Sequence, residues 1–166
     1  MPVPIAIDAT AGGGTSNCYC TVAEAEAYFA SRGFSDNWNG ATPDAQIQAL
    51  LWATRLLDLQ VWRGMKRMYT NALRWPRAGL QDRDGYIVPY DTIPTFIKYA
   101  TCEWALYLLK EDRTLDEGGF TQYGGKVGPI TDPAFYARKP MPDGVREFIA
   151  PYLAGGPVGS GRVGRS

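Results

Sequence analysis

Residues 42–61 read TPDAQIQALLWATRLLDLQV, and this stretch decides the fold class. Thr42 followed by Pro43 marks a helix start, because a threonine cap precedes a proline at the first helical position. Spacings of three and four residues then mark one helical face, which is apolar apart from one threonine: Ile47, Leu50, Leu51, Thr54, Leu57 and Val61. We predict a long helix that buries this face against other helices.

Two further helices flank this one in the chain. Thr21 with Glu24 three residues later forms a capping-box pattern, and Gly33 after Arg32 marks the end of that helix. Residues 94–110 begin with Pro94 and carry apolar side chains around more than half of the helix. Since such a wide apolar face needs cover from more than one side, we expect a further element to pack on it.

The distribution of glycine and proline divides the chain. Residues 1–117 hold 8 Gly and 6 Pro, or 14 of 117, whereas residues 118–166 hold 11 Gly and 6 Pro, or 17 of 49. Both residue types oppose long regular elements. We therefore predict a mainly α protein: a small helical bundle over 1–117 with a long ordered loop, an extended arm over 118–153 with short β pieces and a short C-terminal helix, and a flexible tail over 154–166.

Composition argues against most kinds of chemistry. The chain has no histidine, which is the commonest general base and metal ligand, so we expect no enzyme, no catalytic residue and no cofactor. Its three cysteines, Cys18, Cys20 and Cys102, are fewer than the four ligands of a structural zinc site, so we expect no metal and interpret them as small buried apolar groups. No apolar run reaches membrane-spanning length, and we expect a soluble protein with no membrane partner.

The connection at residues 62–93 is long for an idle loop. Its first half is basic, with Arg63, Lys66, Arg67, Arg74 and Arg77, and it also holds Trp62, Tyr69 and Trp75. Cations beside aromatic rings are typical of proteins that bind single-stranded nucleic acid. Because 17 basic residues balance 17 acidic ones, we favour the other interpretation, in which the rings fold inward and the cations stay solvated, although the stretch could face DNA locally.

Two smaller features concern carboxylates. The sequence Asp82-Arg83-Asp84-Gly85 resembles the start of a calcium loop but lacks the closing glutamate, so an ordinary turn followed by a short strand is the better interpretation. Glu103 lies within the apolar helix at 94–110, where a carboxylate needs a partner. We expect an internal ion pair with Arg55 or Arg74.

Several motifs together resemble those of bacteriophage head-to-tail connector proteins, also called adaptor or head-completion proteins. The most specific one joins Leu-x-Trp-Pro-Arg-x-Gly at 73–79 to Asp-x-Asp-Gly at 82–85 and Ile-Pro at 93–94. The others are CTVAEA at 20–25 with the Tyr-Phe pair at 28–29, ALLWATRLLD at 49–58, IKYA at 97–100, KVGPI at 126–130 and APYL at 150–153. The resemblance extends from about residue 17 to residue 156, and the tail at 154–166 lies outside its pattern.

The resemblance implies a structural protein of the virion neck, made in the bacterial cytoplasm. About a dozen copies would form a ring between the portal and the tail or its terminator or stopper protein, helping to retain packaged DNA in the channel. We expect the arm to stay mobile until it docks on the portal, because it holds few residues that could bury one another. The docking residues would be Lys126, Val127, Gly128, Pro129, Ile130, Val145, Phe148, Ile149, Tyr152 and Leu153.

The sequence also resembles a group labelled DnaT-like single-stranded DNA-binding proteins, which is the alternative function. A free single-strand binder usually carries a basic excess, whereas this chain has a formal charge of zero. In that alternative the five cations of the connection, Arg63, Lys66, Arg67, Arg74 and Arg77, are the candidates to face DNA.

Overall fold

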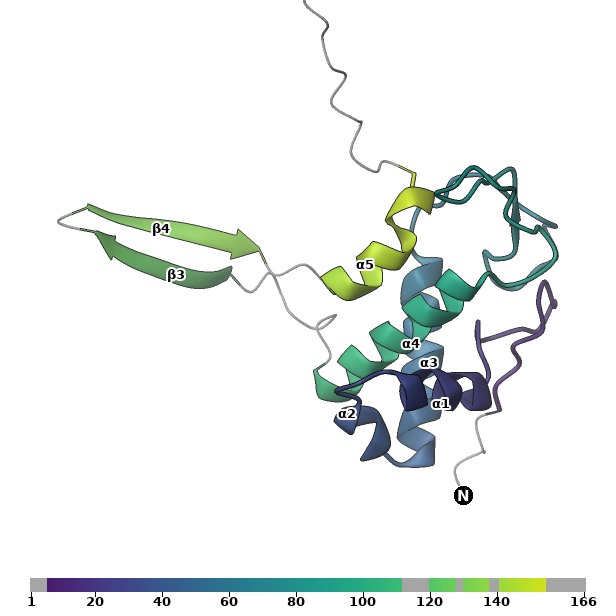
Figure 1. The fold of residues 1–166 in the computed structure, drawn as a ribbon, viewed down its shortest axis with the longest axis horizontal. Coiled ribbons are helices and arrows are strands. Elements are labelled where there is room, and N and C mark those ends of the chain that lie inside the picture. The colour runs from purple at the N-terminus through teal and green to yellow at the C-terminus, as the bar shows by residue number, and fades with distance from the viewer. Residues whose placement is uncertain (1–5, 112–119, 128–129, 138–140, 155–166) are drawn as a thin grey trace, which may run out of the picture.

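The computed structural model describes residues 6–111, 120–127, 130–137 and 141–154, of which 120–127 and 130–137 are described as backbone. The elements in chain order are α1 (Val22–Ser31), α2 (Asp36–Asn39), α3 (Pro43–Asp58), β1 (Met65–Lys66), β2 (Arg77–Ala78), α4 (Thr95–Lys110), β3 (Phe120–Val127), β4 (Ile130–Ala137), α5 (Asp143–Ile149) and a 3₁₀ turn (Ala150–Tyr152). The predicted mainly α fold is confirmed, and Figure 1 shows the helices gathered into one body.

Helices α3 and α4 form the centre of the body. Thr42 caps α3 as predicted, since its hydroxyl accepts a hydrogen bond from the Ala45 amide at 3.3 Å. Leu50 and Leu57 of α3 and Ile97 of α4 are fully buried where the two helices pack. The apolar stripe ends before its predicted last member: α3 stops at Asp58, and Val61 is exposed.

Helix α1 begins as predicted but ends differently. The Thr21 hydroxyl accepts from the Glu24 amide, and the Glu24 carboxylate accepts from the Thr21 amide at 2.9 Å, so the capping box is present. Gly33 was predicted to mark the end of this helix. Instead Arg32 caps α1 in an extended conformation and the left-handed residue is Phe34, with φ of 59°. The short helix α2 then follows, which the sequence did not predict.

Helix α5 corrects the prediction of a free C-terminal arm. Val145 and Ile149 are fully buried and α5 packs against α4, while the Tyr152 ring stacks on Phe96 at 4.0 Å between centroids. These side chains supply the second cover that the wide apolar face of α4 requires. The expectation that residues 145–153 wait for a partner is therefore wrong, because they complete the core of their own chain.

Strands β3 and β4 form an antiparallel hairpin. Their register pairs Val127 with Ile130 at the turn and Phe120 with Ala137 at the open end. The short β pieces predicted for the arm are thus two paired strands of eight residues each, which Figure 1 shows standing away from the helices. The predicted boundary between 117 and 118 lies outside the described residues, and so do residues 155–166 of the tail predicted at 154–166.

The buried polar groups of the body tie α1 to α4. Glu103 of α4 is 5% exposed and accepts hydrogen bonds from the Tyr28 hydroxyl at 2.6 Å and from Arg32, whose Nη2 lies 3.0 Å from Oε2. The predicted ion pair exists, but its partner is Arg32 rather than Arg55 or Arg74. Sequence spacing could not identify this partner, because the choice depends on which face of α1 crosses α4.

The three cysteines are free thiols buried in the core, in agreement with their interpretation as small apolar groups. Within the described part of the chain, no three side chains of the metal-ligating kinds come together at a possible metal site. The same residues include no helix with the length and apolar character needed to cross a bilayer.

Candidate nucleic-acid interface

Two short antiparallel pairings shape the connection at residues 62–93. Strands β1 and β2 pair Met65 with Ala78 and Lys66 with Arg77. A second bridge pairs Gln81 with Ile87 around the predicted turn, in which an Asp82 carboxylate oxygen accepts from the amides of Asp84 at 3.0 Å and Tyr86 at 2.8 Å. The carboxylate that a calcium loop would direct at the ion is thus engaged in an ordinary Asx turn.

The inward side of the connection consists of Trp62, Trp75 and Arg77. The two indole rings are buried and meet edge to face at 5.3 Å between centroids, and Trp75 also contacts Phe96 of α4 at 5.5 Å. The Trp62 indole donates to the carbonyl of Leu57 at 3.1 Å. These two rings fix the connection to the ends of α3 and α4, as the inward interpretation of the aromatics predicts. The same interpretation is wrong for Tyr69, whose side chain is exposed.

Arg77 belongs to this inward side although the sequence made it a candidate for facing DNA. It is 7% exposed, and its guanidinium donates to the carbonyls of Arg63 at 2.8 Å, Gly64 at 2.8 Å and Arg74 at 3.2 Å. Burial lowers the pKa of Arg77, and the positive charge of Arg74 nearby acts in the same direction. Its donors are used in closing the loop, so they are not available to phosphates.

The outward side of the connection is made by Arg67, Tyr69 and Tyr90. The Tyr69 side chain is 93% exposed and Tyr90 is 56% exposed. The Arg67 guanidinium carbon lies 5.6 Å from the centroid of the Tyr90 ring, within the range of a cation–π contact. A guanidinium held on one exposed ring, close in sequence to a second exposed ring, offers both a phosphate contact and surfaces on which bases can stack.

Arg67 and Tyr69 lie in the basic run that the sequence singles out, whereas Tyr90 was not predicted. Tyr86, which is 73% exposed, was missed in the same way. Both tyrosines lie after the basic run at 62–77. The chain turns back through the bridge between Gln81 and Ile87, and Tyr90 then lies against Arg67 of the first half. The signal available in the sequence was the aromatic content of the second half of the connection.

Lys66 and Arg74 surround a partly buried carboxylate, Asp58, at the end of α3. Asp58 accepts a hydrogen bond from the Arg74 amide at 3.1 Å and another from the hydroxyl of buried Tyr19. Burial raises the pKa of Asp58, and this effect outweighs the opposite influence of the hydrogen bonds and of Arg74 and Lys66. When the Asp58 carboxyl is ionised, the cations at this position act beside a negative charge.

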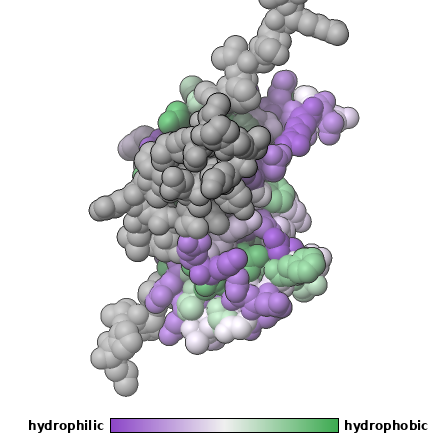
Figure 2. Space-filling model, turned by 90° about the vertical axis from the view of Figure 1, so that its left-hand side faces the viewer, coloured by the Kyte–Doolittle hydropathy of each residue, from purple (hydrophilic) through white to green (hydrophobic). Residues whose placement is uncertain are grey.

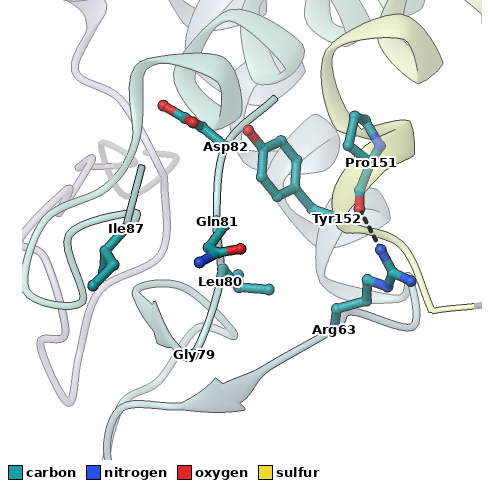
Figure 3. A pocket seen from close by; sticks show the side chains of 8 residues that line it. All are labelled: Arg63, Gly79, Leu80, Gln81, Asp82, Ile87, Pro151 and Tyr152. Atoms are coloured by element: carbon teal, nitrogen blue, oxygen red, sulfur yellow. Dashed lines mark hydrogen bonds between the residues drawn. The ribbon is translucent and has the colours of Figure 1, made fainter. Parts of the chain in front are cut away.

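Arg63 lies at the edge of a cavity of about 780 Å³ between the turn at residues 79–87 and the C-terminal turn. Figure 3 shows its guanidinium donating to the Pro151 carbonyl, at 3.2 Å, with Tyr152 and Leu80 further in and Ile87 on the far side. Arg63 is exposed and retains donors for other contacts. Of the five predicted DNA-facing cations, Arg63, Lys66, Arg67 and Arg74 thus reach the surface and Arg77 does not.

The residues predicted to dock on a portal fall into two groups. Val145, Ile149 and Tyr152 are buried, and Phe148 and Leu153 are partly buried against the same core. Lys126, Val127 and Ile130 belong to the hairpin, of which the backbone is described, while Gly128 and Pro129 lie outside the described residues.

Comparison with known proteins gives one family. The family model described as "Putative DnaT-like ssDNA binding protein" matches residues 3–166. No curated protein and no solved structure matches the chain. Since the match covers nearly the whole sequence, this chain belongs to the DnaT-like ssDNA binding protein family.

Proposed function

We propose that this protein binds single-stranded DNA through the outward side of the connection at residues 62–93. The observation that carries the proposal is the Arg67 guanidinium held over the Tyr90 ring, two residues along the chain from the almost fully exposed Tyr69. Stacking on aromatic side chains tolerates any base sequence, since every base has a π face. The description of the family supports the same function.

The neutral charge of the whole chain sets the expected character of the binding. Four exposed or partly exposed cations, Arg63, Lys66, Arg67 and Arg74, can neutralise only a few phosphates. Each neutralised phosphate of a single strand contributes a slope of about −0.7 to the dependence of log affinity on log salt. The protein should therefore bind oligonucleotides with moderate affinity and a shallow salt dependence. Stacking of bases on the aromatic rings should provide the rest of the binding free energy.

Fluorescence anisotropy of a labelled oligothymidylate tests this function directly. The double variant Arg67→Ala, Tyr69→Ser should lose most of the affinity at physiological salt while keeping the unfolding midpoint of the parent. Lys110→Ala is the matched control, because it removes an exposed cation at the opposite end of α4. Equal affinities of the parent and the double variant would contradict the proposal.

The proposal assigns no reaction to the protein. It keeps the expectation, drawn from the absence of histidine, that the chain is not an enzyme and needs no cofactor.

We propose head-to-tail connection in a phage neck as a second candidate function. The hairpin β3–β4 favours it, because a two-stranded element standing away from a helical body can add to a sheet of another protein. In this function a ring of about a dozen copies would sit between the portal and the tail or its stopper protein in the virion. The motif resemblance, which includes residues 126–130, supports the same function.

Co-purification with a portal ring tests the second candidate. Replacing residues 120–137 by a short Gly-Ser linker removes the hairpin and leaves α5 in the core, which a deletion from residue 118 to the C-terminus would not do. Portal binding should disappear in this variant and persist in the Arg67→Ala, Tyr69→Ser protein. Portal binding that survives removal of the hairpin would contradict the docking role.

A further inference from the structure

The outward face of α3 carries an aromatic ring where a packed helix normally presents polar groups to water. Trp52, Arg55 and Leu59 are spaced by three and four residues, so they share one face, and all three are exposed. Leu50 and Leu57, on the opposite face, are fully buried. Trp52 is 37% exposed, whereas the other four tryptophans of the chain are at most 6% exposed. One indole ring of the protein thus remains in contact with water.

The side chain of Arg55 lies over this indole ring. Its guanidinium carbon is 5.9 Å from the centroid of the Trp52 ring, within the range of a cation–π contact. The sequence offered Arg55 as a partner of Glu103, but Arg32 takes that place. In the described part of the chain, no carboxylate lies within ion-pair distance of Arg55. Its donors are therefore available to a ligand that carries negative charge.

The two carboxylates of α3 do not neutralise this position. Asp44 lies in the first turn of the helix, more than two turns before Trp52. Asp58, at the other end of the helix, accepts hydrogen bonds from the Tyr19 hydroxyl and from the Arg74 amide. The charge held next to the indole ring is therefore positive.

This arrangement has the features that mark the outward side of the connection. The described residues contain two cation–π contacts, Arg55 with Trp52 and Arg67 with Tyr90, and in both of them the ring and the guanidinium are exposed. Exposed apolar area alone does not single out such a site, because Figure 2 shows hydrophobic side chains at the surface among hydrophilic ones. Figure 1 shows α3 leading into the connection, so one short stretch of chain joins the two arginines.

We propose that Trp52 and Arg55 form a second site for single-stranded DNA, in which the indole stacks on a base and the guanidinium binds a neighbouring phosphate. The inference rests on the proposed binding of single-stranded DNA and extends it from the connection to α3. Docking of α3 into a groove of another protein is a poorer fit. It would need apolar side chains three and four residues after Trp52, and these positions hold the charged Arg55 and the buried Leu56.

Intrinsic fluorescence of the full chain tests this second site, since Trp52 is the tryptophan that a ligand can reach. The probe is an oligothymidylate of about 30 nucleotides, longer than the roughly 4–16 nucleotides that one single-strand-binding fold covers. It should quench the tryptophan emission of the parent. In Trp52→Phe the quenching should disappear at oligonucleotide concentrations that saturate the protein, as fluorescence anisotropy of the labelled strand shows.

The affinity for the same oligothymidylate measures what the two side chains contribute. Trp52→Ala should weaken binding by at least about fivefold, the effect of losing one stacked base. Arg55→Gln should make the slope of log affinity against log salt shallower by about 0.7, the value for one phosphate contact. Phe34→Ser is the matched control, because it removes a ring that is 97% exposed and that has no cation–π contact within the described structure. It should change neither quantity.

Failure of this site and failure of the proposed function give different results. If the parent binds oligothymidylate and the quenching is as large in Trp52→Phe, the second site is overturned while the site on the connection remains supported. Parental affinity in a folded Trp52→Ala protein would overturn the second site in the same way. If the parent does not bind oligothymidylate at all, the proposed function is wrong, and the second site is wrong with it.

Discussion

The inward and outward sides of the connection at residues 62–93 are built from the same kinds of residue. Trp62, Trp75 and Arg77 face inward and are buried, whereas Tyr69, Tyr90 and Arg67 face outward. An arginine lies among aromatic rings on each side. On the inward side the guanidinium closes the loop by binding backbone carbonyls, and on the outward side it rests on an exposed ring with donors left for a ligand.

This difference shows why a basic and aromatic composition does not by itself identify a binding surface. A guanidinium can satisfy the carbonyls of a loop that has no regular partner, and indole rings can supply the core that anchors such a loop. The composition then describes a structural element. Binding is indicated only where the ring and the cation remain exposed together, which depends on how the chain returns on itself.

Truncation of an inward ring should have the largest effect on stability. Trp75→Ala removes a fully buried indole that contacts Trp62, Phe96 and Tyr152, and we expect a loss of about 3–5 kcal/mol in the free energy of unfolding. Urea denaturation followed by circular dichroism measures it. The outward counterpart Tyr69→Ala should change this free energy by less than about 0.5 kcal/mol. Similar losses in both variants would mean that the inward and outward rings contribute equally to stability, contrary to the difference in their burial.

Substitution of the inward arginine should cause the next largest loss in the free energy of unfolding. Arg77→Met keeps the length and apolar stem of the side chain but leaves the carbonyls of Arg63, Gly64 and Arg74 without their donor. Hydrogen bonds to a charged group contribute about 1.5–3 kcal/mol each when made, and relaxation of the loop recovers part of that, so we expect a loss of about 2–3 kcal/mol.

Oligonucleotide affinity separates the two possible roles of Arg77. At a temperature where Arg77→Met is still folded, its affinity and its salt dependence should match those of the parent. If the slope of log affinity against log salt became shallower by about 0.7 in this variant, one phosphate contact would have been lost. Arg77 would then contact DNA, contrary to its position in the loop.

The elements that local sequence determines were predicted well. The N-caps of α1 and α3, the apolar stripe of α3 as far as Leu57, and the Asp82 turn follow from residues within a few positions of one another. The partner of Glu103 and the fate of α5 were not predicted, since they depend on which surfaces meet after folding. A short amphipathic helix after a glycine-rich segment has the same sequence pattern whether its apolar face packs on α4 or on another protein.

The candidate site divides in the same way. The exposed cations and Tyr69 could be identified as candidates from the sequence, because they lie in one basic run. Tyr90 and the burial of Arg77 were not, since both follow from the pairing of strands and from the packing of Trp75. The sequence also gave no indication of Phe34: it predicted that the helix ends at Gly33, and the left-handed residue is Phe34, one position later.

On the outward side, single substitutions should alter binding without altering stability. Arg67→Ala and Tyr69→Ala should each weaken oligothymidylate binding by about 1–3 kcal/mol, the usual contribution of one stacked base. Tyr90→Phe is the conservative control for the cation–π contact, because it keeps the ring that Arg67 approaches. If Tyr90→Phe weakened binding as much as Arg67→Ala, the hydroxyl rather than the ring would be the important group.

The smallest expected effect concerns Asp58, where the two sides of the connection meet. Its carboxylate binds the Arg74 amide and the Tyr19 hydroxyl, and burial raises its pKa above the ordinary value of 3.8. The folded protein therefore takes up this proton at a higher pH than the unfolded chain does. The stabilising contribution of Asp58 is complete below the unfolded pKa and is lost as the pH rises through the folded pKa.

Asp58→Asn keeps an oxygen acceptor and removes both the charge and the titration. At neutral pH the variant should bind oligothymidylate about two- to fivefold more tightly, since it frees Lys66 and Arg74 from an opposing charge whose effect is under about 1 kcal/mol. On acidification from neutral pH the parent should approach the affinity of the variant. Thymine does not titrate in this range, so the convergence reports on the protein. Parallel pH profiles of the two proteins would mean that Asp58 serves the inward side alone, through Tyr19 and the Arg74 amide, and that its charge does not reach the outward cations.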